Sequence, residues 1–280
     1  MTTPSAAHAA PSLEQLLGDV NELPVLPEVA VRIFDEMRSP RVTAARMAEF
    51  IKKDPVLASS VLRIANSALY GGRTRISDLA FAIARVGLNQ IRNLLLAMVL
   101  RSKMADPKVY GETGVALMDH GLAVAFGAGV VADTTGIAGS EAFMCGLLHD
   151  FGKLALIKSL RESNAGNALD EAQNAFITEK HGAAGAMLAR AWELPDIVSI
   201  VAEHHHEVED APDGAGPMVA AVAFANVLAH RLGLGEPART EIDLHTHPAK
   251  RILDMDETQI EEVHDYLPGL FRTARSALFG

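Results

Sequence analysis

The chain has 280 residues, of which 49% are apolar and 21% charged, so it is long and apolar enough to bury a sizeable core. Extensive disorder away from the ends is therefore not expected. The formal net charge of −10 argues against a duplex DNA-binding protein, because such proteins usually present a basic surface. Arg73, Arg75, Arg85 and Arg92 leave room for a local basic face, although arginines at this spacing more often form a solvated helix face.

The predicted compartment is the cytoplasm. The single cysteine, Cys145, excludes an internal disulfide and fits a reducing environment. The start, MTTPSAAHAAPS, lacks the basic and apolar segments of a signal peptide. The longest uncharged apolar stretch, Gly121–Ala132, is too short to span a bilayer.

The first half of the chain predicts helices that follow a flexible leader within residues 1–15, which is rich in Ala, Pro, Ser and Thr. Apolar residues recur at helical spacing. Helices are expected to start at Ser12, Pro27, Thr43, Pro55, Asp78 and Leu88. Thr43, Asp54 and either Ser77 or Asp78 are the expected N-caps, and Pro55 suits the first helical position.

The second half predicts more helices and no convincing alternating strand. They are expected over Thr113–Asp133, Ser140–His149, Asp170–Lys180, Gly182–Trp192, Asp196–His206, Pro217–Leu234 and Thr258–Leu267. The predicted class is all-α, a multi-helix bundle. Breaks at Asp106-Pro107 and Gly111 suggest an N-terminal helical part over 16–108, a second bundle over 109–235 and a C-terminal helical extension over 236–280.

Histidines fall at positions that suit one shared site. His120 lies in a long helix, His149-Asp150 end an apolar one, His181 is expected to open a helix, and His204-His205-His206 end the next; Asn226 follows in an apolar stretch. Imidazole and carboxylate are the usual ligands of Zn, Fe and Mn. Each residue alone is better explained as a satisfied core group or a solvated one. Their occurrence together favours a metal site, with Lys153 adding a positive charge beside it.

Several segments together resemble a known family. LLHDFGK is similar to the His-Asp hallmark of HD-domain metal-dependent phosphohydrolases. LPVLPEVAVRIFDEM, IKKDPVLASSVLRIANSALYG, ISDLAFAIARVGLNQIRNLLLAMVL and EAFMCGLLHDFGKLAL resemble the HDOD domain, the HD-related output domain, over roughly Leu16 to Leu234. The resemblance implies an HD-type helical fold, a bacterial origin and a place as an output or scaffold module in signalling.

The resemblance also implies a ligand set. His120, His149 and Asp150 match one metal's ligands, with Asp150 as the bridge to a second ion held by His181, His204 and His205. Lys153 matches a lysine that contacts phosphate or a bridging water, which makes Asp150 and Lys153 the catalytic residues if the site is active. His206 has no counterpart in the pattern. One or two divalent transition-metal ions, Fe, Mn or Zn, are expected.

Two departures from the catalytic members are expected to lower activity. Asn226 stands where they carry a final aspartate, and a neutral amide is a weaker metal ligand than a carboxylate. The GYP signature of the cyclic di-GMP phosphodiesterases is absent, since EVEDAPDGAGPMV follows the histidines.

Three readings of the function remain open. The first is a non-enzymatic signalling module that binds signalling proteins or a nucleotide second messenger, with no direct nucleic-acid or membrane partner. The second is a metal-dependent phosphohydrolase acting on a nucleotide or cyclic di-nucleotide. The third, a structural bundle with scattered histidines, explains the pattern least well. We favour the first because of Asn226 and the missing GYP, while the histidine set and Lys153 support the second.

Overall fold

The computed structural model describes residue 13 and residues 28–38, 42–72, 74–104, 106–163 and 168–279. Within these ranges the chain forms helices joined by turns and no β-strand, which confirms the all-α class. The expected leader (apart from residue 13) and the helix starts at Ser12 and Pro27 lie outside the described residues.

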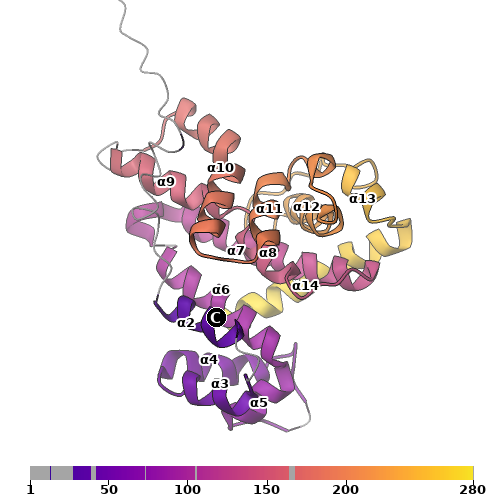
Figure 1. The fold of residues 1–280 in the computed structure, drawn as a ribbon. Coiled ribbons are helices and arrows are strands. Elements are labelled where there is room, and N and C mark those ends of the chain that lie inside the picture. The colour runs from indigo at the N-terminus through magenta and orange to yellow at the C-terminus, as the bar shows by residue number, and fades with distance from the viewer. Residues whose placement is uncertain are drawn as a thin grey trace, which may run out of the picture.

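The N-terminal helices form one end of the molecule (Figure 1). They are α2 (Glu28–Arg38), α3 (Ala44–Ile51), α4 (Pro55–Ala65), α5 (Leu79–Val86) and α6 (Leu88–Met104). The expected caps are present: Thr43 accepts from the Arg46 amide at 3.2 Å, Asp54 from the Val56 amide at 2.8 Å, and Asp78 from the Phe81 amide at 3.0 Å. Such caps satisfy amides that have no partner inside the helix.

The remaining helices surround α7 and α12. They are α7 (Pro107–Thr135), α8 (Ala142–Leu148), α9 (Phe151–Ser163), α10 (Glu171–Ala191), α11 (Asp196–His204), the 3₁₀ turn Val208–Asp210, α12 (Gly216–Leu232), α13 (Pro248–Ile252) and α14 (Glu257–Phe279). Helix α7 packs against α8, α12 and α14. Small residues allow close approach: a Cβ on Gly146 would lie 2.7 Å from the Val124 carbonyl oxygen.

Helix α7 extends beyond both ends of the uncharged apolar stretch Gly121–Ala132. Gly111, with φ of +62°, interrupts it near its start, as expected from the sequence. Residues 108–135 form a helix that is long and apolar enough to cross a membrane. However, 78% of its most apolar 18-residue segment is buried inside the structure. A helix buried in the core of a protein has this character.

Two sequence predictions of the helices were wrong, and two helices were not predicted. Asp170–Lys180 and Gly182–Trp192 are a single helix, α10, so His181 lies in mid-helix instead of opening one. Gly182 is needed for packing, because its Cβ would lie 2.9 Å from the Ala202 carbonyl oxygen of α11. Helix α14 continues through Pro268 instead of ending at Leu267. Helix α9 and the short α13 were not predicted.

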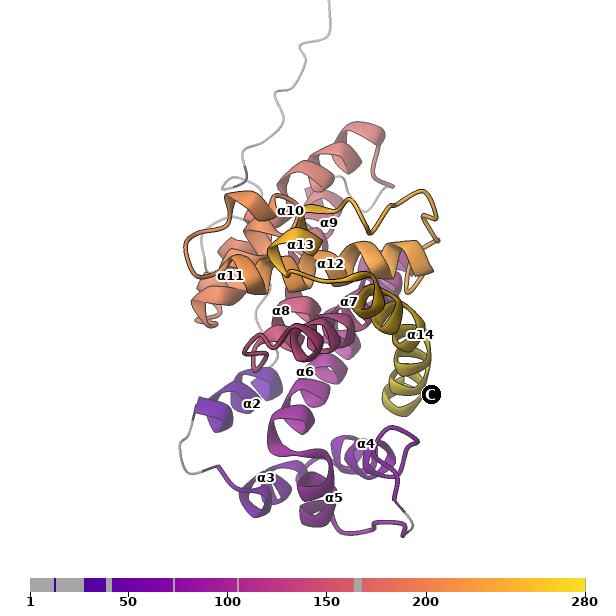
Figure 2. The same ribbon diagram turned by 90° about the vertical axis from the view of Figure 1, so that its right-hand side faces the viewer.

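Helix α14 connects the two ends of the molecule, running from the bundle to α4 (Figure 2). Arg63 of α4 donates to the carbonyl oxygens of Ala277 at 2.7 Å and Leu278 at 2.9 Å, which lack partners inside the helix. Asp119 of α7 pairs with Arg275 at 2.8 Å and with Arg101 at 3.3 Å. Residues 257–279 are therefore packed against both helical groups.

Candidate metal centre

The His149-Asp150 pair lies in the turn between α8 and α9, at a helix end as the sequence indicated. Both side chains are buried, with 1% and 5% of their surface exposed. His149 Nε2 and Asp150 Oδ1 have no hydrogen-bond partner among the described residues. Buried polar atoms without partners are costly, so these two atoms mark a place suited to a ligand.

Three histidines from α10 and the end of α11 converge on Asp150. The Nε2 atom of His181 lies 3.3 Å from Asp150 Oδ1, and that of His205 lies 3.6 Å from it. The same His181 nitrogen is 3.4 Å from His205 Nε2 and 3.1 Å from His206 Nε2. Ligand atoms of Asp150, His181, His205 and His206 all lie within 4.8 Å of one another.

Backbone carbonyls fix the ring orientation of three of the histidines. Nδ1 of His149 lies 2.8 Å from the Gly146 oxygen, that of His181 2.8 Å from the Thr178 oxygen, and that of His205 2.9 Å from the Ala202 oxygen. A carbonyl oxygen only accepts, so each Nδ1 carries a proton and Nε2 is the ring atom left to face the site. This second-sphere arrangement is typical of metal-binding histidines.

The spacing of these nitrogens fits a transition metal. Two nitrogens at about 2.1 Å from one ion lie roughly 3.0 Å apart at a right angle and about 3.4 Å apart in a tetrahedral site. The observed separations of 3.1 and 3.4 Å fall in this range. His181 and His205 both carry their proton on Nδ1, so their Nε2 lone pairs, 3.4 Å apart, repel one another unless a cation lies between them, and the donor set therefore fits a divalent metal.

The structure brings only two of the three consecutive histidines into the cluster. His205 and His206 are in the cluster, whereas His204, which the family pattern had suggested, is not. His205 continues the buried face of α11 marked by Val198 and Val201, while His204 falls on the half-buried face. His206 follows the helix end and reaches His181 from the exposed rim.

The other donor set is buried and differs in chemistry. Ligand atoms of His120, His149 and Asp150 lie within 4.8 Å of one another. His120 Nε2 lies 2.9 Å from Asn226 Oδ1, so the amide contacts a ring nitrogen that would otherwise face this site. Lys153 donates to Asp150 Oδ2 at 2.6 Å, and the same oxygen is 3.4 Å from His149 Nε2.

His230 belongs to this environment and was missed by the sequence analysis. Its ring stacks on His120 with centroids 4.4 Å apart, and its Nδ1 lies 3.3 Å from a Glu236 carboxylate oxygen. One signal was available: His230 follows Asn226 by four residues, which places both on one face of a helix.

Burial lowers the pKa of His181, His205, His206 and His230, while neighbouring groups keep Asp150 ionised. Burial alone would raise the pKa of Asp150, but His149 and Lys153 reverse this and hold it well below its ordinary value. Burial, with charge repulsion from neighbours, lowers the pKa of His181 to about 4 and of His206 and His230 to about 3. At neutral pH these rings keep a lone pair available for a metal.

We expect the metal-free protein to lose stability as the pH falls from 6.5 towards 4. In this window the unfolded chain binds protons at His181, His206 and His230, whereas the folded chain, with pKa values of about 3 to 4, does not. Urea unfolding in EDTA at pH 7.5, 6 and 5 measures the effect. A His230→Gln variant should show a shallower dependence, and equal stability at pH 7.5 and 5 would contradict the assignment.

Comparisons with known proteins show which sequences and folds the chain is similar to. A protein from Treponema pallidum (strain Nichols), described as uncharacterized, is 28% identical over 221 residues; the match covers 74% of this chain but only 42% of that protein. The fold is similar to a crystal structure of an HDOD domain protein of unknown function from Geobacter sulfurreducens, with a TM-score of 0.75, 22% identity, and coverage of 92% of this chain and 94% of that one.

A second crystal structure, from Shewanella amazonensis SB2B and provisionally named a metal-dependent phosphohydrolase, gives a TM-score of 0.70 at 17% identity, covering 94% and 96% of the two chains. At identities this low, the structural similarity establishes a shared fold and nothing more. The family assignment rests on the match of the HDOD domain family to residues 23–208, about two thirds of the sequence. The chain therefore belongs to the HDOD family.

Proposed function

We propose that this protein is a regulatory module of bacterial signal transduction, acting in the cytoplasm through binding of a signalling protein or a nucleotide. It holds one divalent transition-metal ion, Fe, Mn or Zn, through Asp150, His181, His205 and His206. The observation that carries the proposal is the difference between the two donor sets on either side of Asp150.

The donor set at Asp150 Oδ1 supports tight binding of one ion. His181 and His205 have their Nδ1 protons held by backbone carbonyls and their Nε2 atoms directed at this oxygen. Little reorganisation is needed before binding, which favours affinity. A bound ion would supply positive charge that links the α8–α9 turn to α10 and α11, and so would stabilise the fold around the site.

The donor set at Asp150 Oδ2 is poorly suited to a second ion. The Lys153 ammonium at 2.6 Å already neutralises that oxygen. His120 lies against the neutral Asn226 amide and not against a carboxylate. Since two-metal hydrolysis depends on both ions, this asymmetry favours binding over turnover, and Lys153 is better explained as the partner of Asp150 than as a catalytic group.

The test combines metal content with activity. We expect one ion per chain after expression with added iron and manganese, and turnover of cyclic di-GMP or an aryl phosphate slower by several orders of magnitude than an ordinary rate of about one per second. Asn226→Asp, which restores a carboxylate at similar size, is expected to gain a second ion. Asn226→Ala is the matched control and should not.

The phosphohydrolase is the second candidate function. The specific observation in its favour is that ligand atoms of His120, His149 and Asp150 lie close enough to surround an ion. Two ions per wild-type chain, together with turnover of a cyclic di-nucleotide at about one per second or faster, would establish it over the regulatory module. Two ions in Asn226→Asp without hydrolysis would favour the module.

A further inference from the structure

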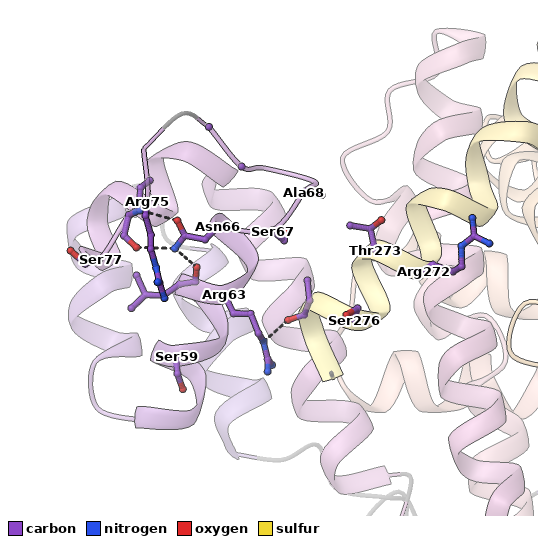
Figure 3. A pocket seen from close by; sticks show the side chains of 15 residues that line it. Ser59, Arg63, Asn66, Ser67, Ala68, Arg75, Ser77, Arg272, Thr273 and Ser276 are labelled. Carbon is purple, nitrogen blue, oxygen red and sulfur yellow. Dashed lines mark hydrogen bonds between the residues drawn. The ribbon is translucent and has the colours of Figure 1, made fainter.

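A wide groove lies away from the metal centre, between the N-terminal helices and the end of α14. Its volume is about 1390 Å³, more than the roughly 300–1,000 Å³ of usual small-molecule sites. Figure 3 shows its two walls, with Asn66, Ser67 and Arg75 on one side and Thr273 and Ser276 of α14 on the other. The groove therefore has room for a ligand of nucleotide size.

The charge of the groove is opposite to that of the whole chain. Arg63, Arg75 and Arg272 line it, and no Asp or Glu does so among the described residues, although the chain carries a net charge of −10. Arg63 is engaged by the carbonyls at the end of α14. Arg75 and Arg272 form no ion pair with a residue that the structure describes, so their charge is available to an anion.

The wall that carries Arg75 is held in place by the Asn66 side chain. Its amide nitrogen donates to the carbonyl oxygens of Leu62 at 2.7 Å and Ile76 at 2.8 Å, and its oxygen accepts from the Ile76 amide at 2.8 Å. These bonds close the segment after α4 onto the helix. The opposite wall is held by the Arg63 contacts with α14, so the groove is largely formed before any ligand arrives.

The hydroxyl groups along the groove complement the arginines. Ser59, Ser67 and Thr273 donate to carbonyls of their own helices at 2.6, 2.7 and 2.8 Å, which leaves their oxygens free to accept. A ligand that fits must therefore present negative charge to the arginines and N–H or O–H groups to these oxygens. Nucleotides have this combination in their phosphates, ribose hydroxyls and base amines.

We propose that this groove binds a free nucleotide, with Arg75 and Arg272 attracting its phosphates from opposite walls and the hydroxyl-bearing residues contacting its sugar or base. The site is separate from the metal centre and does not depend on the proposed function of that centre. Arg75 lies between α4 and α5 and not on a helix face, and the proposal takes up the local basic face for which the sequence left room.

The experiment measures binding of ATP, GTP and inorganic pyrophosphate to the full chain by calorimetry, in EDTA to remove metal. We expect ATP or GTP to bind more tightly than pyrophosphate. The double variant Arg75→Ala/Arg272→Ala should weaken nucleotide binding about tenfold or more, because charge-assisted hydrogen bonds are lost. Arg251→Ala, on an exposed arginine of α13, is the matched control and should bind as the wild type does.

The same titration with Asp150→Ala separates the groove from the metal centre. Unchanged nucleotide binding in that variant supports the groove, and its loss places the nucleotide at the metal centre and overturns the proposal. Equal affinity of the wild type and the Arg75→Ala/Arg272→Ala variant also overturns it. So does pyrophosphate binding as tightly as either nucleotide, since the groove would then recognise phosphate alone.

Discussion

Asp150→Ala is expected to abolish transition-metal binding. Its Oδ1 atom lies within 3.6 Å of His181 and His205, while Oδ2 lies 3.4 Å from His149. It is the only residue shared by both candidate donor sets of the described chain. Changes in groups that merely orient ligands cost about 10–100-fold in metal affinity, so loss of this ligand should cost more than about 100-fold. Elemental analysis and competition with a chelating dye measure it.

A pair of histidine variants tests which residues of the triple histidine contribute. His205→Ala should release the metal as Asp150→Ala does, because His205 is buried and its Nε2 is aimed at Asp150. His204→Ala, one position earlier on the half-buried face of α11, is expected to keep the metal. Loss of metal in His204→Ala as well as in His205→Ala would show that the family pattern, which includes both histidines, describes the site better than this geometry does.

The sequence predicted most of the helices because their signals are local. Asp54 and Pro55 start α4 through interactions within one turn, and Thr43 and Asp78 act in the same way. The errors arose where packing between helices decides whether a segment stays helical. Gly182 stays helical because α11 approaches closely at that point, and a single sequence does not reveal that neighbour.

The residues of the candidate site divide in the same way, into those that a local motif predicts and those that depend on tertiary packing. The positions of His120, His149, Asp150, His181 and His205 could be inferred from the family motif, and the structure brings them together. The motif supplies two histidines where this chain has three, and the resemblance assigned them to His204 and His205, whereas the structure has His206 in the cluster instead of His204. Adjacent helical residues point about 100° apart, and only the helix register relative to the core makes that choice.

Lys153 and Asn226 show what spacing alone does not reveal. The sequence places a lysine three residues after Asp150, which suits either an ion pair or a contact with a ligand. The structure has the ion pair, at 2.6 Å. Asn226 was identified as a departure from the catalytic pattern, and its bond to His120 adds a buried partner for that ring. Both contacts weaken the same donor set.

Gly152→Ala is expected to destabilise the protein by about 3 kcal/mol or more, at the upper end of the cost of overpacking. Gly152 lies inside α9 and its φ is not positive, so its role is not to form a turn. A Cβ there would lie 1.9 Å from the His181 carbonyl oxygen and 2.6 Å from the Gly185 amide nitrogen. Both atoms are backbone, so no side chain can move aside.

The added methyl group must therefore separate α9 from α10, and with it the His149-Asp150 turn from His181. Urea unfolding of the metal-free protein measures the stability loss, and a metal titration should show weaker binding in the same variant. Gly129→Ala in α7 is the matched control, since a Cβ there meets no atom within 4 Å. Helix propensity favours alanine there by up to about 1 kcal/mol. If Gly152→Ala unfolds like the wild type and binds metal as tightly, then close contact between these helices does not hold the two halves of the donor set together.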